Sequence, residues 1–174
     1  TVFDLRKVPL ALIKPVLESR ETVAHNAMFE MKHLRHAGIN PLRMHCTLLM
    51  ARVASGQPLM SLAKAAAAYL PDLKETPIDK TLQVSNWNAE SLTQSQIDYS
   101  ALDAVLAREL WRALGEIIRT TGQSAAYRRM AAAVPVVADQ MLAGMGFDTQ
   151  KHRQWLAEWQ AEQLPLRDQL QREI

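Results

Sequence analysis

Two pairs of polar residues stand four positions apart, and each pair contains one carboxylate. Asn26 is followed by Glu30, and Tyr99 is followed by Asp103. A spacing of four places both members of a pair on one face of a helix. Carboxylates brought together from different elements are the oxygen ligands that Mg²⁺ or Mn²⁺ prefers. A tyrosine one turn before an aspartate is suited to orient or deprotonate a metal-bound water.

Both pairs fall on segments that are expected to be helices. Asn26 is a favoured N-cap residue, and an apolar pattern with a rough helical period follows it until Gly38. Thr93 begins a capping-box pattern that leads to Tyr99, and residues 102–118 continue as a long amphipathic helix. The spacing alone is weak evidence, because most carboxylates on helices are solvated surface charges.

The remaining segments predict many helices and few strands. Short apolar runs at residues 2–5 and 22–25 are typical of strands. The alanine-rich segment 61–70 predicts a helix, because alanine is the best helix former. Two further helices are expected at residues 125–143 and 149–174. The expected fold class is therefore α/β or α+β.

The composition is that of an ordinary globular protein. The 174 residues are 48% hydrophobic and 22% charged, which argues against a disordered chain. The single cysteine excludes an intramolecular disulfide and favours a reducing, cytoplasmic compartment. No apolar run approaches the roughly 20 residues of a membrane span, so no membrane partner is expected. A net charge of +2 is too small to indicate a polyanionic partner by itself.

The sequence around both pairs resembles two motifs of the DEDD 3′–5′ exonucleases. Residues 25–34, His-Asn-Ala-Met-Phe-Glu-Met-Lys-His-Leu, resemble the second motif of that superfamily. Residues 99–103, Tyr-Ser-Ala-Leu-Asp, resemble the third motif of the tyrosine subclass. The segments 79–87 and 92–99 look like the connection between these motifs. The resemblance covers residues 1–118 and implies a ribonuclease H-like α/β sheet flanked by helices.

The end of the chain resembles a different region of one branch of this superfamily. Residues 141–148, Met-Leu-Ala-Gly-Met-Gly-Phe-Asp, resemble the start of the polymerase region in family A DNA polymerases, and Asp148 is the expected N-cap of the next helix. The resemblance implies an exonuclease domain at residues 1–119, a linker at 120–124 and the first thumb helices at 125–174. The resemblance implies a cytoplasmic protein, which would be nucleoid-associated in a bacterium.

The resemblance also assigns roles to individual residues. In the family, carboxylates hold two divalent metal ions, Mg²⁺ or Mn²⁺, at the 3′ end of a DNA strand. Glu30 would be a metal ligand, directly or through water, and Asp103 a direct ligand. Tyr99 would orient the attacking water. Asn26 and Phe29 would contact the frayed DNA 3′ end, with Phe29 packing on a base or sugar.

The sequence departs from the family pattern in its carboxylates. The first motif, Asp-x-Glu on an opening strand, is absent, and the nearest candidate, Asp4-Leu-Arg6, lacks the glutamate. Glu30 stands where aspartate is typical. We therefore expect a chain that lacks the N-terminal strands of the domain and is inactive by itself, within a protein that also synthesises DNA. The alternatives are a degenerate exonuclease fold that serves as a DNA-binding scaffold, and a ribonuclease D-like exoribonuclease.

Two further groups of residues favour structural roles. Trp155 and Trp159 lie on one helix face, which is more typical of packing than of base stacking. A zinc site is disfavoured, because the spacing of its four potential ligands matches no strong zinc pattern. These ligands are His33, His36, His45 and Cys46.

Overall fold

The chain divides into two units, of which the first ends at Leu142 and the second begins at Ala143. The computed structural model describes residues 2–58, 60–73 and 80–173. Asp79, the first residue of the expected connecting segment, lies outside this range. The expected linker at residues 120–124 falls at a turn between helices α5 (Gln94–Thr120) and α6 (Ser124–Ala143).

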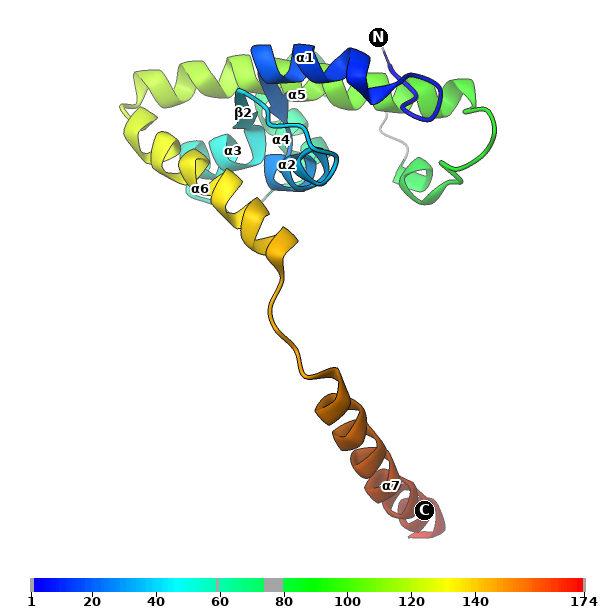
Figure 1. Ribbon diagram of the computed structural model, residues 1–174. Coiled ribbons are helices and arrows are strands. Elements are labelled where there is room, and N and C mark those ends of the chain that lie inside the picture. The colour runs from blue at the N-terminus through cyan, green and yellow to red at the C-terminus, as the bar shows by residue number, and fades with distance from the viewer. Residues whose placement is uncertain (1, 59, 74–79, 174) are drawn as a thin grey trace. The chain divides into compact units, whose positions relative to one another are not determined.

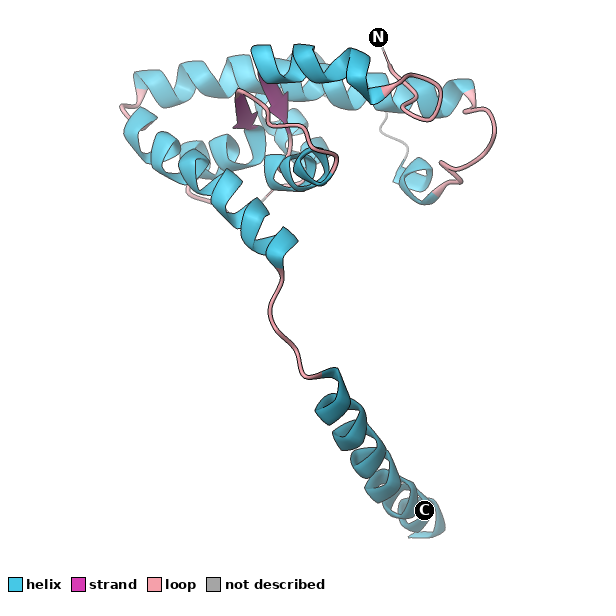
Figure 2. Ribbon diagram, in the orientation of Figure 1, coloured by secondary structure: helices cyan, strands magenta, loops and turns pink. Residues whose placement is uncertain are grey.

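The strands of the first unit form a parallel pair (Figure 2). Strand β1 (Glu21–Ala24) pairs with β2 (Arg43–Cys46), in a register that sets Ala24 opposite Cys46. Helix α2 (Ala27–His36) connects the two strands, as parallel pairing requires a crossover. The sequence predicted β1 but not β2.

The expected strand at residues 2–5 is wrong. The backbone N–H groups of Lys7 and Val8 both donate to the carbonyl of Asp4, which makes this segment a turn. The Asp4 carboxylate also accepts hydrogen bonds from the backbone and side chain of Arg6. Local bonds of an aspartate to its own backbone compete with strand pairing. Helix α1 (Leu10–Ser19) follows this turn.

Helix α5 is the long element of the first unit, and two other helices and strand β1 contact it (Figure 1). The capping box predicted at Thr93 is present, with reciprocal bonds between Thr93 and Gln96. One stripe of α5 is fully buried against α3 (Thr47–Ser55) and α4 (Leu62–Tyr69). Each buried leucine contributes about 2 kcal/mol of hydrophobic free energy. The stripe consists of Leu106, Leu110, Leu114 and Ile118.

Helix α6 covers β2. The hydroxyl of the buried Tyr127 accepts a hydrogen bond of 3.2 Å from the backbone N–H of Cys46. Further along α6, Val134 and Ala138 join the apolar cluster that contains Met44. A strand edge without a partner exposes N–H groups that other chains could pair with, and Tyr127 satisfies one of these groups.

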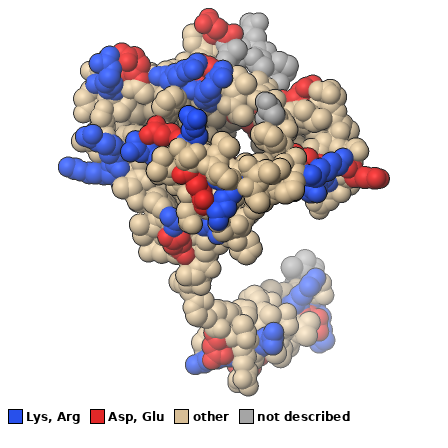
Figure 3. All heavy atoms as spheres, turned by 45° about the horizontal axis from the view of Figure 1, so that its top comes forward, with Lys and Arg blue, Asp and Glu red and all other residues tan. Residues whose placement is uncertain are grey.

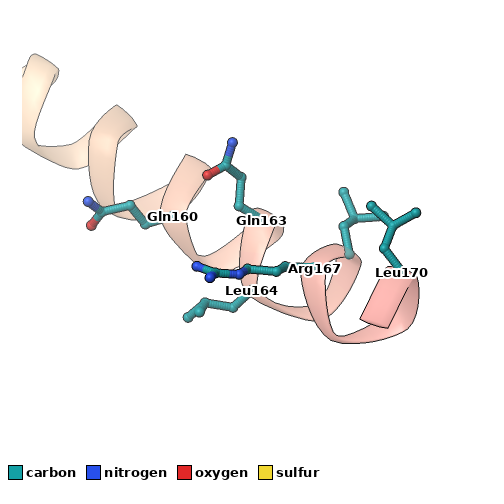
Figure 4. Close-up of a pocket in the computed structure, with 6 residues that line it drawn as sticks. Gln160, Gln163, Leu164, Arg167 and Leu170 are labelled. Atoms are coloured by element: carbon teal, nitrogen blue, oxygen red, sulfur yellow. The ribbon is translucent and has the colours of Figure 1, made fainter. Parts of the chain in front are cut away.

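Short 3₁₀ helices, Pro71–Leu73 and Lys80–Val84, lie between α4 and α5. In the second unit, α7 (Thr149–Glu173) follows Asp148. The Asp148 side chain accepts a hydrogen bond from the backbone N–H of Lys151, as the N-cap prediction expects. Side chains such as Leu164, Arg167 and Leu170 project from α7 and are exposed (Figure 4). None of the described helices is long and apolar enough to cross a membrane.

Candidate active site

Two carboxylates that are far apart in the sequence line one cavity. Glu30 of α2 and Asp103 of α5 border a space of about 210 Å³. The end of β1 and the first residue of α4 complete its wall. The remaining lining residues are Val23, Ala24, His25, Leu62, Ala104 and Ala107. The structure thus brings together the two residues that the sequence predicted as metal ligands.

A tight turn at Asn26 directs Glu30 into this cavity. Strand β1 ends at Ala24 and α2 begins at Ala27, so the chain reverses over two residues. Asn26 has φ 71° and ψ 50°, the left-handed conformation that asparagine tolerates better than most residues. It occupies the predicted N-cap position, but its side chain makes no capping hydrogen bond. Its contribution to the site is therefore the backbone turn.

The Glu30 carboxylate is held in an environment that favours a cation. Its Oε2 atom is buried and has no hydrogen-bond partner. Burial raises the pKa of this carboxyl group above its ordinary value, opposed by a backbone hydrogen bond within Glu30 itself. A buried oxygen without a donor requires an explanation, and a bound cation supplies one. The residue therefore fits a metal ligand.

Tyr99 and Asp103 interact directly on α5. The Tyr99 hydroxyl donates a hydrogen bond to the Asp103 carboxylate. Burial raises the pKa of Asp103, and the bond from Tyr99 opposes this shift. The pKa of Tyr99 is also raised, by burial first and by the neighbouring Asp103 charge, while a hydrogen bond from the Gln83 side chain acts in the other direction. The hydroxyl is thus held next to a carboxylate of the cavity.

His25 lines the same cavity, and the sequence analysis did not assign it a role. Its Nε2 lies 2.9 Å from the carbonyl oxygen of Met60, which can only accept, so Nε2 carries the proton. Its Nδ1 lies 2.9 Å from the Thr47 hydroxyl. Burial lowers the pKa of His25 and keeps the ring neutral. Both nitrogens are engaged, so His25 fixes the end of β1 rather than ligating a metal. Its position as the last residue of a predicted strand was the available signal.

Asn26 and Phe29 lie outside the carboxylate cavity. Asn26 borders a separate, mostly apolar cavity of about 310 Å³, which Met28 and Met130 also line. Phe29 is 55% exposed. Its ring centre lies 4.5 Å from that of His33 and 5.6 Å from the Lys32 ammonium group. An exposed aromatic ring beside two basic side chains is a surface on which a base could stack.

The described residues provide two carboxylates at this site and no larger ligand cluster. In residues 2–58, 60–73 and 80–173, no three His, Cys, Asp or Glu side chains are arranged to hold a metal ion. Asp4 does not contribute, because it pairs with Arg6 at 2.7 Å, and the hydrogen bond from the Arg6 side chain lowers the pKa of Asp4 to about 2. The first-motif carboxylates are therefore missing from the described site.

Residues 2–119 match the model of the 3′–5′ exonuclease family. This match covers more than half of the chain, and the chain belongs to that family. The matched region holds Glu30 and Asp103, which line the carboxylate cavity, and Tyr99, which lies one helical turn before Asp103. The chain is also 28% identical over 118 residues to DNA polymerase I of Aquifex aeolicus. That alignment covers 67% of this chain and 20% of the polymerase, so the chain spans about a fifth of this relative.

Solved structures of a Brucella melitensis nuclease, NrnC, share the fold. One superposes with a TM-score of 0.67 at 24% identity, over 79% of this chain and 66% of that one. The same protein bound to pGG gives a TM-score of 0.66 at 24% identity, over 82% of this chain and 69% of that one. A third structure, with bound Mg²⁺, gives a TM-score of 0.65 at 23% identity. These likenesses confirm the expected α/β, ribonuclease H-like exonuclease fold.

Proposed function

We propose that this chain supplies part of a metal-dependent 3′–5′ exonuclease centre that removes nucleotides from the 3′ ends of DNA. One observation carries the proposal: Glu30 and Asp103 share a cavity, and Tyr99 is hydrogen-bonded to Asp103. Burial raises the pKa of both carboxyl groups, as expected where carboxylates are partly buried in order to bind a cation. The Mg²⁺ in a structure of the Brucella nuclease supports the choice of a hard divalent ion.

Each residue has a separate task in this mechanism. Glu30 and Asp103 would hold the divalent ions, which supply stabilisation of phosphate charge and a water of lowered pKa. Tyr99 remains hydrogen-bonded to Asp103 and presents its hydroxyl oxygen to the attacking water. Asn26 and the exposed Phe29 would contact the terminal nucleotide.

The missing carboxylates are expected on a strand beside β1. Among the described residues, β1 pairs only with β2, so its other edge is unpaired. Val23 and Ala24 of β1 line the carboxylate cavity, and a strand added along the unpaired edge would bring its own side chains next to it. Without such a strand, we expect the 174-residue chain to be inactive as a nuclease.

The wider context that we propose is a DNA polymerase I-like protein, in which residues 1–119 form the exonuclease domain, 120–124 a linker and 125–174 the start of the thumb. The match to Aquifex DNA polymerase I supports this context. A second candidate is a nuclease that acts on short oligonucleotides, since the structural neighbour from Brucella was solved with pGG.

The test uses the full-length protein and labelled substrates in Mg²⁺ or Mn²⁺. We expect release of nucleotides from the 3′ end of DNA, loss of this activity in Asp103→Asn, and normal activity in the control Asp98→Asn, an exposed aspartate on the same helix. Preference for a mispaired DNA end supports proofreading, whereas preference for pGG supports the second candidate. Nuclease activity that survives in Asp103→Asn would remove Asp103 from the mechanism, and a full-length protein without nuclease activity would leave the scaffold alternative.

A further inference from the structure

A second polar cavity, of about 680 Å³, lies along β2 between α2 and α6. It shares no lining residue with the carboxylate cavity. Three arginines from three different elements line it: Arg35 from α2, Arg43 from β2 and Arg128 from α6. Its volume is in the range of sites that bind small molecules. On the face drawn in Figure 3, Lys and Arg side chains are visible together with Asp and Glu side chains.

The charges around this cavity do not cancel. Arg43 pairs with Glu21 at 2.6 Å, and Arg35 pairs with Asp139. Arg128 is exposed and has no ion pair among the described residues. Three guanidinium groups therefore face two carboxylates, and one full positive charge is left over.

Arg35 also has an unused hydrogen-bond donor. One of its terminal nitrogens donates to the carbonyl of Pro135 at 3.3 Å, but its Nε atom is buried and has no partner. A buried N–H without an acceptor is rare in folded proteins and points to a ligand or an ordered water. An anionic oxygen in the cavity would satisfy this donor.

Contacts within the fold hold the backbone of β2 and α6 at the cavity. Tyr127 is only 9% exposed and joins α6 to β2 through the N–H of Cys46. Its hydroxyl lies 3.4 Å from Nδ1 of His45, whose Nε2 lies 3.3 Å from Glu21. These contacts hold β2 and α6, the elements that carry Arg43 and Arg128. The entropy cost of ordering these elements on ligand binding is therefore small. The other lining residues are largely apolar and include Met31, Met44 and Pro135.

We propose that this cavity binds a nucleotide through a terminal phosphate. Guanidinium groups match phosphate oxygens in bidentate pairs, and a terminal phosphate carries a charge of about −1.5 to −2, which suits an excess of arginine better than a carboxylate does. The apolar side of the cavity provides a surface for a base or sugar. The phosphate belongs either to a free nucleoside monophosphate or to the 5′ end of a strand. The inference does not depend on hydrolysis at the carboxylate cavity.

The test is a titration without divalent metal, in the Asp103→Asn background, so that the carboxylate cavity does not contribute. The probes are dAMP and a short DNA strand with or without a 5′ phosphate, followed by calorimetry and by backbone amide shifts in β2 and α6. We expect at least a tenfold loss of affinity in Arg128→Gln. The control Arg112→Gln removes an exposed arginine of α5 and should change affinity less than twofold.

Each outcome decides the proposal. Binding of dAMP that depends on Arg128 supports a free nucleotide, and binding of the phosphorylated strand alone supports a strand end. A second variant, Arg43→Gln, should weaken the same ligand. The proposal is overturned if neither probe binds, if binding survives unchanged in Arg128→Gln, or if the unphosphorylated strand binds as well as the phosphorylated one.

Discussion

Glu30 and Asp103 reach one cavity from two helices that both follow β1 in the sequence, α2 directly after the strand and α5 much later. Helix α5 contacts β1 as well as α3 and α4, and the buried leucines of α5 fix its rotation. Asp103 lies one turn before the buried Ala107, so packing of the helix sets where the carboxylate lies. The site therefore depends on the core as much as on its own residues.

Metal affinity should increase with pH. Burial raises the pKa of Glu30 and of Asp103, so both groups hold their protons above the ordinary carboxyl range. A cation binds the ionised forms, and protons compete with it. We expect the Mn²⁺ affinity, measured by electron paramagnetic resonance from about pH 5 to about pH 8, to decrease as the pH falls. Below the pKa values of the two groups, the decrease should be about tenfold per pH unit for each proton that the ion displaces. A pH-independent affinity in this interval would contradict the role of both carboxylates.

Glu30→Gln should stabilise the fold at neutral pH and weaken metal binding. The folded state binds the Glu30 proton more tightly than the unfolded state, because burial raises the pKa of the carboxyl group. Stability is therefore lost as pH rises from the ordinary carboxyl pKa through the raised one. Glutamine carries no charge at any pH, so the variant should gain about 1 kcal/mol of unfolding free energy near pH 7, and less near pH 4.

Urea unfolding of both proteins at the two pH values measures this difference. Glu116→Gln serves as the control, because that exposed carboxylate pairs with Arg119 and should give no such gain. A destabilised Glu30→Gln at neutral pH would show that the ionised Glu30 is satisfied within the fold.

Tyr99→Phe should reduce turnover without abolishing metal binding. The substitution removes the hydroxyl that donates to Asp103 and keeps the ring near Trp87, whose ring centre lies 6.3 Å away. We expect kcat of the full-length nuclease to fall roughly a hundredfold, the size of a lost acid–base or orienting group. Loss of the hydrogen bond also raises the pKa of Asp103 further, so the Mn²⁺ binding curve should move to higher pH. Tyr69→Phe is the matched control, since the Tyr69 hydroxyl has no hydrogen bond in the described part of the chain.

Tyr127→Phe should destabilise the first unit. The variant leaves the buried N–H of Cys46 without its acceptor, and a buried donor without a partner costs about 1 to 3 kcal/mol. Thermal unfolding followed by circular dichroism should show a lower Tm for this variant than for Tyr69→Phe. Equal melting temperatures would mean that water or a shifted backbone satisfies Cys46.

Local signals were sufficient for most helices and for one strand. The capping box at Thr93, the alanine-rich segment of α4 and the N-cap at Asp148 act within one or two turns, and the structure confirms each of them. Strand β2 was not predicted, because four residues that include Arg43 and His45 carry too little apolar pattern. Its strand conformation comes from pairing with β1 and from the cover of α6, which are contacts across long stretches of sequence.

The sequence by itself determined the identities of Asn26, Glu30, Tyr99 and Asp103. It also placed Tyr99 and Asp103 on one helix face, because a spacing of four on a helix has one geometric meaning. Only the tertiary structure decided which of these residues share a cavity. It unites Glu30 with Asp103, ties Tyr99 to Asp103, and places Asn26 in another cavity. It also gathers Arg35, Arg43 and Arg128, which no pattern in the sequence connects. The physical reason is that helix rotation and strand register are set by burial of the apolar core, which involves residues distant in the chain.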